Sequence, residues 1–238
     1  MITKGDRILV ALDFPTLEKA MVVATPLRGK TGFKVGMQLN TAAGSPAVIA
    51  ALGRDVFLDL KFHDIPNTVA GAALAAGYLG VKMFNVHCLG GKLMMEAAVK
   101  AAHSILIDVP GYRPLVIGVT ILTSHDEASL TAIGIDPMMS MEAIVRRLTI
   151  MAMESGLDGV VCSPHEILTV KRVVPRGDNF LIITPGIRKS TDPPDDQKRT
   201  MTAREARDLG ADYLVIGRPI TNAADPVAAA EEFIAEIS

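Results

Sequence analysis

The 238-residue chain is poor in several residue types, and each shortage excludes a class of protein. Its only two cysteines, Cys88 and Cys162, cannot form the disulfide framework that stabilises small secreted domains. Trp is absent and aromatic residues make up 4%, so the core must consist mainly of Ala, Val, Ile, Leu and Met. The net charge of -2 provides no basic excess, which argues against a dedicated nucleic-acid-binding protein.

Long apolar segments are also missing. The longest uncharged stretch, residues 35–53, is interrupted by polar residues, a proline and three glycines. A membrane span needs about 20 predominantly apolar residues, so we expect none in this chain. The N-terminal residues MITKGDRILV lack the apolar core and cleavage site of a secretory signal, which favours a cytoplasmic location.

Short β-branched runs alternate with Ala-rich amphipathic stretches along the chain. Near-continuous apolar runs of this length are typical of parallel strands that are buried on both faces. We expect eight strands, at residues 8–12, 32–35, 56–60, 83–86, 115–120, 159–162, 181–184 and 213–217. We expect helices at residues 17–27, 46–52, 67–79, 91–102, 141–154, 164–173, 203–209 and 226–237.

This alternation predicts an α/β fold, namely a (β/α)8 or TIM barrel formed as a single domain over residues 1–238. Eight repeats in 238 residues give about 30 residues each, the length that a strand–helix–strand unit requires. No linker rich in Pro, Gly and Ser divides the chain. The alternative is an open doubly wound sheet, but the turn after the first strand reads DFPT and lacks the Gly-rich motif of that fold.

In such a barrel the functional site lies at the carboxyl ends of the strands. The polar residues at these positions are Asp13, Lys34, Asp59, Lys61, Asp64, Asn85, His87, Thr120, Thr123, Ser124, Ser163, Thr184, Arg188 and Arg218. Because side chains alternate along a strand, Asp59 and Lys61 should share the face toward the barrel interior. Lys34 ends the neighbouring strand, and we expect Asp64 to fold back over the site.

These two lysines and two aspartates form a net-neutral cluster in which each charge has an opposite neighbour. The alternative interpretation is an ordinary ion-pair network that closes the barrel end. A lysine between carboxylates stays protonated and can donate a proton, whereas a Schiff-base nucleophile must be neutral. The sequence has no HExxH motif, Cys/His ligand cluster or Ser-His-Asp arrangement. The cluster therefore favours protonation of a carbanion beside a carboxylate that repels a leaving carboxylate.

A second group of residues is suited to binding phosphate. Gly217 allows close backbone approach after the last strand, and the planar guanidinium of Arg218 matches a phosphate group. After the seventh strand, the segment TPGIR ends at Arg188. Barrels of this kind commonly bind phosphate at the loops that follow the seventh and eighth strands. The polar segment that follows is expected to form a lid near residues 186–200, with a disordered loop as the alternative.

In order and over nearly the whole chain, these motifs resemble the bacterial form of the orotidine 5'-phosphate decarboxylase family. The most specific is LDLKFHDIPNT at residues 58–68. The others are ALD (11–13), FKVG (33–36), VTILTS (119–124), TPGIR (184–188), DQKR (196–199) and IGRPIT (216–221). The resemblance implies conversion of orotidine 5'-phosphate (OMP) to UMP in pyrimidine biosynthesis, without a metal or any other cofactor.

The resemblance also implies a role for each charged residue. Lys61 would be the general acid that protonates C6 of the pyrimidine, and Asp59 would lie against the substrate carboxylate. Lys34 would hold Asp59 and a ribose hydroxyl, and Asp13 would also bind the ribose. Asp64 would enter the site of a partner subunit, which implies a homodimer with two shared sites.

The remaining predicted site residues bind the substrate. The resemblance implies that two residues meet the edge of the pyrimidine ring, namely Thr123 and Ser124. Two more would reach the partner's site together with Asp64, namely Ile65 and Thr68. Four would hold the phosphate, with Gln197 arriving on the closing lid, namely Arg188, Gln197, Gly217 and Arg218.

Two other functions compete with this interpretation. Sugar-phosphate enzymes of the same barrel group, such as 3-keto-gulonate-6-phosphate decarboxylase and hexulose-phosphate synthase, share the DxKxxD motif but use Mg²⁺. They lack the Thr123-Ser124 contact and the lid that joins Arg188 to Gln197. A nucleotide-binding sensor without catalysis would be marked by loss of Lys61 or Asp59, and both are present.

Overall fold

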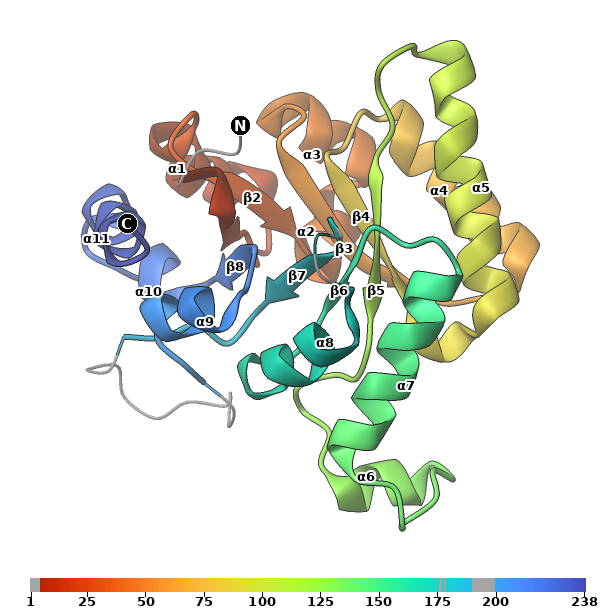
Figure 1. The fold of residues 1–238 in the computed structure, drawn as a ribbon. Helices are drawn as coiled ribbons and strands as arrows, with labels where there is room; N and C mark the ends of the chain where they lie inside the picture. The colour runs from red at the N-terminus through yellow and green to blue at the C-terminus, as the bar shows by residue number, and fades with distance from the viewer. Residues whose placement is uncertain (1–4, 176, 178, 190–199) are drawn as a thin grey trace.

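The computed structural model describes residues 5–175, 177, 179–189 and 200–238, and its strands close into a parallel barrel (Figure 1). The strands are β1 (Ile8–Ala11), β2 (Gly32–Val35), β3 (Val56–Phe62), β4 (Met83–His87), β5 (Leu115–Val119), β6 (Gly159–Val161), β7 (Leu181–Thr184) and β8 (Tyr213–Ile216). They pair in sequence order, and β8 returns to β1 with Val215 opposite Leu9. The predicted (β/α)8 barrel is confirmed, and every predicted strand is present to within two residues at each end.

Helices surround the barrel and connect successive strands (Figure 1). They are α1 (Leu17–Leu27), α2 (Met37–Ala43), α3 (Ser45–Leu52), α4 (Pro66–Tyr78), α5 (Lys92–Asp108), α6 (Glu127–Ala132), α7 (Met141–Glu154), α8 (Ile167–Val173), α9 (Ala203–Leu209), α10 (Arg218–Thr221) and α11 (Pro226–Glu236), with 3-10 turns at Gly5–Arg7, Cys88–Gly90 and Pro164–Glu166. All eight predicted helices are present, although α5 continues six residues beyond its predicted end. Within the described residues, no helix is both long enough and apolar enough to cross a bilayer.

Three short helices, α2, α6 and α10, were not predicted. Each has only four to seven residues, so an apolar repeat is hard to recognise, and among helices this short only α8 and α9 were predicted. Two of them follow strand ends directly. Gly36 precedes α2 after β2, and Gly217 precedes α10 after β8, so both helices lie beside the end of the barrel where the predicted site is.

Apolar residues fill the barrel interior near the amino ends of the strands. The inner cluster lies within the first three positions of its strands and consists of Leu9, Phe57, Met83, Ile117, Ile183 and Tyr213. A larger cluster, which includes Val10, Leu58 and Phe84, packs between the strands and the helices. Because the interior is plugged at the amino end, space for a ligand remains at the carboxyl end.

Candidate active site

A cavity of about 600 Å³ opens at the carboxyl ends of the barrel strands. This volume lies in the range typical of small-molecule sites. Eight of the residues predicted from the sequence line it, namely Asp13, Lys34, Asp59, Lys61, Thr123, Arg188, Gly217 and Arg218. They come from β1, β2, β3, β5, β7 and β8 or the loops that follow, so barrel closure brings them together.

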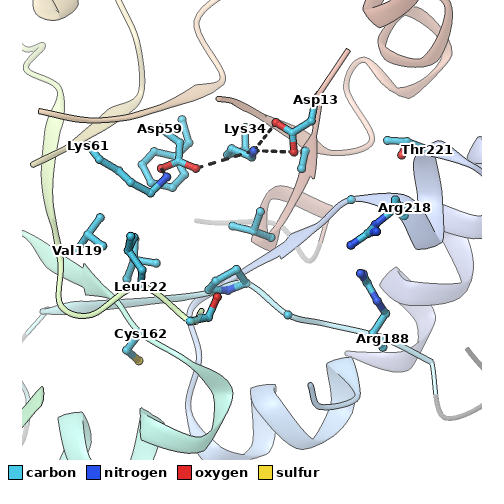
Figure 2. Close-up of a pocket in the computed structure, with 18 of the residues that line it drawn as sticks. Asp13, Lys34, Asp59, Lys61, Val119, Leu122, Cys162, Arg188, Arg218 and Thr221 are labelled. Atoms are coloured by element: carbon cyan, nitrogen blue, oxygen red, sulfur yellow. Dashed lines mark hydrogen bonds and ion pairs between the residues drawn. The ribbon is translucent and has the colours of Figure 1, made fainter. Parts of the chain in front are cut away.

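Four charged side chains form a row of alternating sign along one side of the cavity (Figure 2). The Nζ atom of Lys34 donates hydrogen bonds to both carboxylate oxygens of Asp13, at 2.7 and 3.0 Å. The same Nζ atom lies 3.9 Å from Oδ2 of Asp59. Lys61 donates from Nζ to Oδ1 of Asp59 at 2.7 Å. We call Asp13–Lys34–Asp59–Lys61 the charged row, and it carries no net charge.

The fourth member of this row is Asp13, where the sequence suggested Asp64. The expectation that Asp64 folds back over its own site is not met, because its side chain is exposed and does not line the cavity. Its Oδ1 instead accepts a hydrogen bond from the backbone N–H of Ile65 at 2.6 Å. Helix α4 begins at Pro66, so the chain turns away from the cavity directly after Asp64.

Asp59 and Lys61 share the inner side of β3, as alternation predicts, but the strand is irregular between them. In the register with β4, Leu58 lies opposite Phe84 and Phe62 lies opposite Val86, so β3 bulges between these pairs. Lys61 has a φ of 54°, and it is the one non-glycine residue with positive φ in the described part of the chain. Such a conformation costs about 1–3 kcal/mol and occurs most often at functional sites.

The buried residue Asn85 is hydrogen-bonded to both Asp59 and Lys61. The sequence analysis named it among the polar residues near the strand ends but predicted no role for it. Its Nδ2 donates to Oδ1 of Asp59 at 2.6 Å, and its Oδ1 accepts from the backbone N–H of Lys61 at 2.7 Å. One signal was available, because Asn85 is the polar member of the apolar run at residues 83–86. A buried amide needs hydrogen-bond partners, which must come from neighbouring strands.

Two arginines face each other at the other end of the cavity (Figure 2). Arg188 is positioned by a bridge between Ile187 and Met201, in which the Arg188 N–H donates to the Met201 carbonyl at 3.0 Å. Arg218 follows Gly217 directly after β8 and is the first residue of α10. The cavity therefore has a cationic end separated from Lys61 by the rest of the charged row. Gln197 and residues 190–199 of the predicted lid lie outside the described residues.

The third part of the cavity is apolar and lies across from Lys61 in Figure 2. It contains Val119, Leu122 and Cys162, with Thr123 beside them. Burial raises the pKa of the Cys162 thiol, so this side chain stays neutral. Ser124 is exposed and does not line the cavity. The surface can therefore hold a flat ring, with Thr123 as its polar contact.

Two histidines lie near Lys61 but do not line the cavity. His87 is buried in β4 and stacks on His63, with ring centroids 5.4 Å apart. Burial, together with the nearby charges of His63, Lys61 and His125, lowers the pKa of His87 to about 4. His87 is therefore neutral at pH 7 and adds no charge beside Lys61.

Known proteins resemble this chain over nearly its full length. Residues 6–233 match the model of the orotidine 5'-phosphate decarboxylase / HUMPS family. An orotidine 5'-phosphate decarboxylase of Trichlorobacter lovleyi is 50% identical and covers 98% of this chain and 95% of its own. The corresponding protein of Syntrophotalea carbinolica is 47% identical and covers 100% and 97%.

A solved structure agrees with these sequence matches. The crystal structure of orotidine 5'-phosphate decarboxylase from Lactobacillus acidophilus has a TM-score of 0.83 and 34% identity, and the match covers 98% of this chain and 99% of that one. With a barrel closed in the same way and a family match over residues 6–233, the chain belongs to the orotidine 5'-phosphate decarboxylase / HUMPS family.

Proposed function

We propose that this protein decarboxylates OMP to UMP in pyrimidine biosynthesis, with the charged row as its reaction centre. One observation carries the proposal. The ion-paired Lys61 and Asp59 lie at one end of a cavity that has Arg188 and Arg218 at the other. A nucleoside monophosphate has the matching arrangement, because its phosphate and its base lie on opposite sides of the ribose.

The reaction breaks the bond between C6 and the carboxylate carbon. The bonding electron pair remains on C6 and CO2 leaves, after which the Nζ atom of Lys61 transfers a proton to C6. The neutral Lys61 amine is then protonated again from water. Asp59 is held by Lys61, Asn85 and Lys34, so it cannot turn away from a bound carboxylate. Stabilisation of the developing charge by groups already in place is the main source of rate enhancement in such sites.

Other cavity residues would bind the remote parts of the substrate. Arg188, Arg218 and Gly217 suit the phosphate, whereas Asp13 and Lys34 suit the ribose hydroxyls. Thr123 would meet the pyrimidine. We propose that Ser124 also meets the pyrimidine, and that Gln197 reaches the phosphate on the lid near residues 186–200. Binding energy from the phosphate would then lower the barrier at C6.

We also propose that two copies of the chain share their sites as a homodimer. The segment from Asp64 to Thr68 is exposed, and it includes the apolar side chain of Ile65, which is 66% exposed. Leu93 at the start of the neighbouring helix α5 is 73% exposed. A second subunit would bury these apolar groups, and its cavity would receive Asp64, Ile65 and Thr68 from this chain.

We also propose a cytoplasmic location, because the two free, buried cysteines suit a reducing compartment.

The same family includes enzymes of sugar phosphates, so the substrate must be tested. In the charged row the ammonium of Lys34 lies against both Asp13 and Asp59. A divalent cation bound by these two carboxylates would have to displace it. This arrangement favours the metal-independent decarboxylation over a reaction that requires Mg²⁺.

The deciding experiment follows the ultraviolet absorbance of OMP after addition of protein treated with EDTA. Conversion to UMP without added metal supports the proposal. Absence of conversion, together with Mg²⁺-dependent activity on a hexulose phosphate, would assign the protein to the sugar-phosphate enzymes. UMP binding without either activity would identify a nucleotide sensor.

A further inference from the structure

Strand β4 contains a fully buried amide, Asn85, which is 0% exposed. Its neighbours Phe84 and Val86 belong to the cluster between strands and helices. Because side chains alternate along a strand, Asn85 faces the barrel interior on the same side as Met83. A buried amide without hydrogen bonds would be destabilising, and both of its partners lie on β3.

The two hydrogen bonds fix the orientation of this amide. Oδ1 accepts from the backbone N–H of Lys61 at 2.7 Å, and Nδ2 donates to Oδ1 of Asp59 at 2.6 Å. The reversed orientation would place an NH2 group against an N–H and a carbonyl against a carboxylate. Only one orientation therefore satisfies both partners.

The bulge in β3 explains why Lys61 needs this partner. Leu58 lies opposite Phe84 and Phe62 lies opposite Val86, so residues 59–61 of β3 share the single residue Asn85 on β4. The backbone there cannot continue the regular ladder of hydrogen bonds. Asn85 supplies the acceptor for the Lys61 N–H, at a residue whose φ of 54° is unfavourable without support from its surroundings.

We infer that Asn85 is a positioning residue for the Lys61–Asp59 pair, and this inference rests on the proposed decarboxylase function. Asn85 does not line the cavity and acts through the two residues that do. One amide holds the backbone of the proton donor and one carboxylate oxygen of its partner. The Lys61 ammonium donates to that same oxygen, so the three groups form one hydrogen-bonded unit.

Steady-state kinetics of Asn85→Ala test this inference. We expect kcat to fall on the order of 100-fold, because displacement of a reacting group by about 1 Å can have an effect of that size. KM should change little, because the arginines and Asp13 that would bind the remote phosphate and ribose make no hydrogen bond to Asn85. The matched control is Thr149→Val, which removes another fully buried side-chain hydrogen bond, from Thr149 to the Val145 carbonyl in α7. We expect wild-type kcat from that control.

A second variant, Asn85→Asp, separates positioning from simple loss of stability. When the new carboxyl group is ionised, it accepts from the Lys61 N–H but repels Asp59. When it is protonated, it can accept from the Lys61 N–H and also donate to the Asp59 carboxylate, as the amide does. The charged or titratable groups nearest this position are Asp59 and Lys61 on β3, Lys34 on β2 and His87 on β4, which is stacked on His63. The kcat ratio of Asn85→Asp to wild type should therefore rise several-fold from pH 9 to pH 6, since the ratio cancels titrations that both proteins share.

The outcomes distinguish this inference from the proposed function. If the wild-type protein does not decarboxylate OMP, the proposed function fails and the role of Asn85 fails with it. If the wild type is active and a folded Asn85→Ala retains kcat within threefold, the inference is overturned while the function stands. If Asn85→Ala does not fold, by circular dichroism, the pH ratio of Asn85→Asp decides alone, and a flat ratio overturns the inference.

Discussion

The ammonium of Lys61 and the carboxylate of Asp59 are joined by a 2.7 Å hydrogen bond between residues only two positions apart in one strand. The backbone between them is bulged, and Lys61 is in the left-handed region of φ. The strained backbone at Lys61 thus directs its ammonium group into the cavity beside the carboxylate of Asp59. A pair fixed in this way need not rearrange when charge develops on a substrate.

Replacement of Lys61 by alanine should remove turnover while product binding survives. We expect kcat for OMP to fall by roughly 10³-fold or more, because Lys61 is the proposed general acid. UMP affinity, measured by isothermal titration calorimetry, should stay within about tenfold, since the arginines that would bind the phosphate lie at the other end of the cavity. Retained turnover in Lys61→Ala would rule out the assignment of the proton donor.

Replacement of Arg218 by alanine should affect catalysis as well as binding, although Arg218 lies at the other end of the cavity from Lys61. We expect kcat/KM for OMP to decrease by about 100-fold or more, which corresponds to about 3 kcal/mol of lost transition-state stabilisation. The residue borders the cavity at its cationic end, where the substrate phosphate would bind. An unchanged kcat/KM would show that the phosphate binds elsewhere.

A shared site predicts that two inactive variants complement each other. Mixed subunits of Lys61→Ala and Asp64→Asn should recover about a quarter of wild-type activity, since half of the dimers are hybrids with one intact site of two. Asp64 is exposed in the single chain and does not line its own cavity, so its loss should be repaired by the other subunit. Light scattering should give the mass of a dimer. A monomeric mass, or a mixture without activity, would disprove the shared site.

Gly36 provides space for the ion pair between Asp13 and Lys34. A Cβ atom at this position would lie 2.9 Å from Oδ1 of Asp13 and 3.1 Å from Nζ of Lys34. Gly36→Ala should therefore displace these flexible side chains and raise KM for OMP several-fold, with little change in the unfolding temperature. The control is Gly71→Ala, where a Cβ meets no atom within 4 Å and kcat and KM should be unchanged. Equal kinetics for the two variants would show that the ion pair tolerates displacement.

His87 predicts a defined acid sensitivity of the folded state. Its pKa is lowered from 6.5 to about 4, so the unfolded chain binds a proton that the folded chain does not between these values. His87 therefore does not reduce the free energy of unfolding above pH 6.5. As the pH falls from 6.5 to 4, protonation of His87 in the unfolded chain lowers this free energy, by roughly 3 kcal/mol at most. Urea unfolding at pH 7 and pH 4.5 should show a smaller loss in His87→Phe than in the wild type. Equal losses would show that His87 titrates normally.

Much of the fold could be predicted from local patterns. Several elements have the predicted bounds, namely strands β2 and β7 and helices α1, α7 and α9. Their bounds follow from the repeat of apolar residues, from capping residues and from glycines that end helices, and each of these signals involves only a few neighbouring positions. Thr16 caps α1 by accepting from the Lys19 N–H, and Thr is a common residue at this position. Short helices such as α6 carry no such period and were missed.

The site was predictable to a lesser extent, for a specific reason. The residues of the predicted site were selected from the positions that follow strand ends, and eight of them line one cavity. The choice between Asp13 and Asp64 as the fourth member of the row could not be made in this way. It depends on the distances from Lys34 to residues of other loops, and the spacing of residues along the chain does not give these distances.

The sequence by itself determined the order of strands and helices, and the resemblance that its motifs carry pointed to the family to which the chain belongs. The tertiary structure alone decided that Asp13 pairs with Lys34, that Lys61 adopts a left-handed backbone, and that Asn85 holds it. The first kind of information lies in residues two to four positions apart, whose side chains share a face through the local geometry of strands and helices. The second kind arises from strand register and barrel closure, which place residues that are distant in sequence within hydrogen-bond reach.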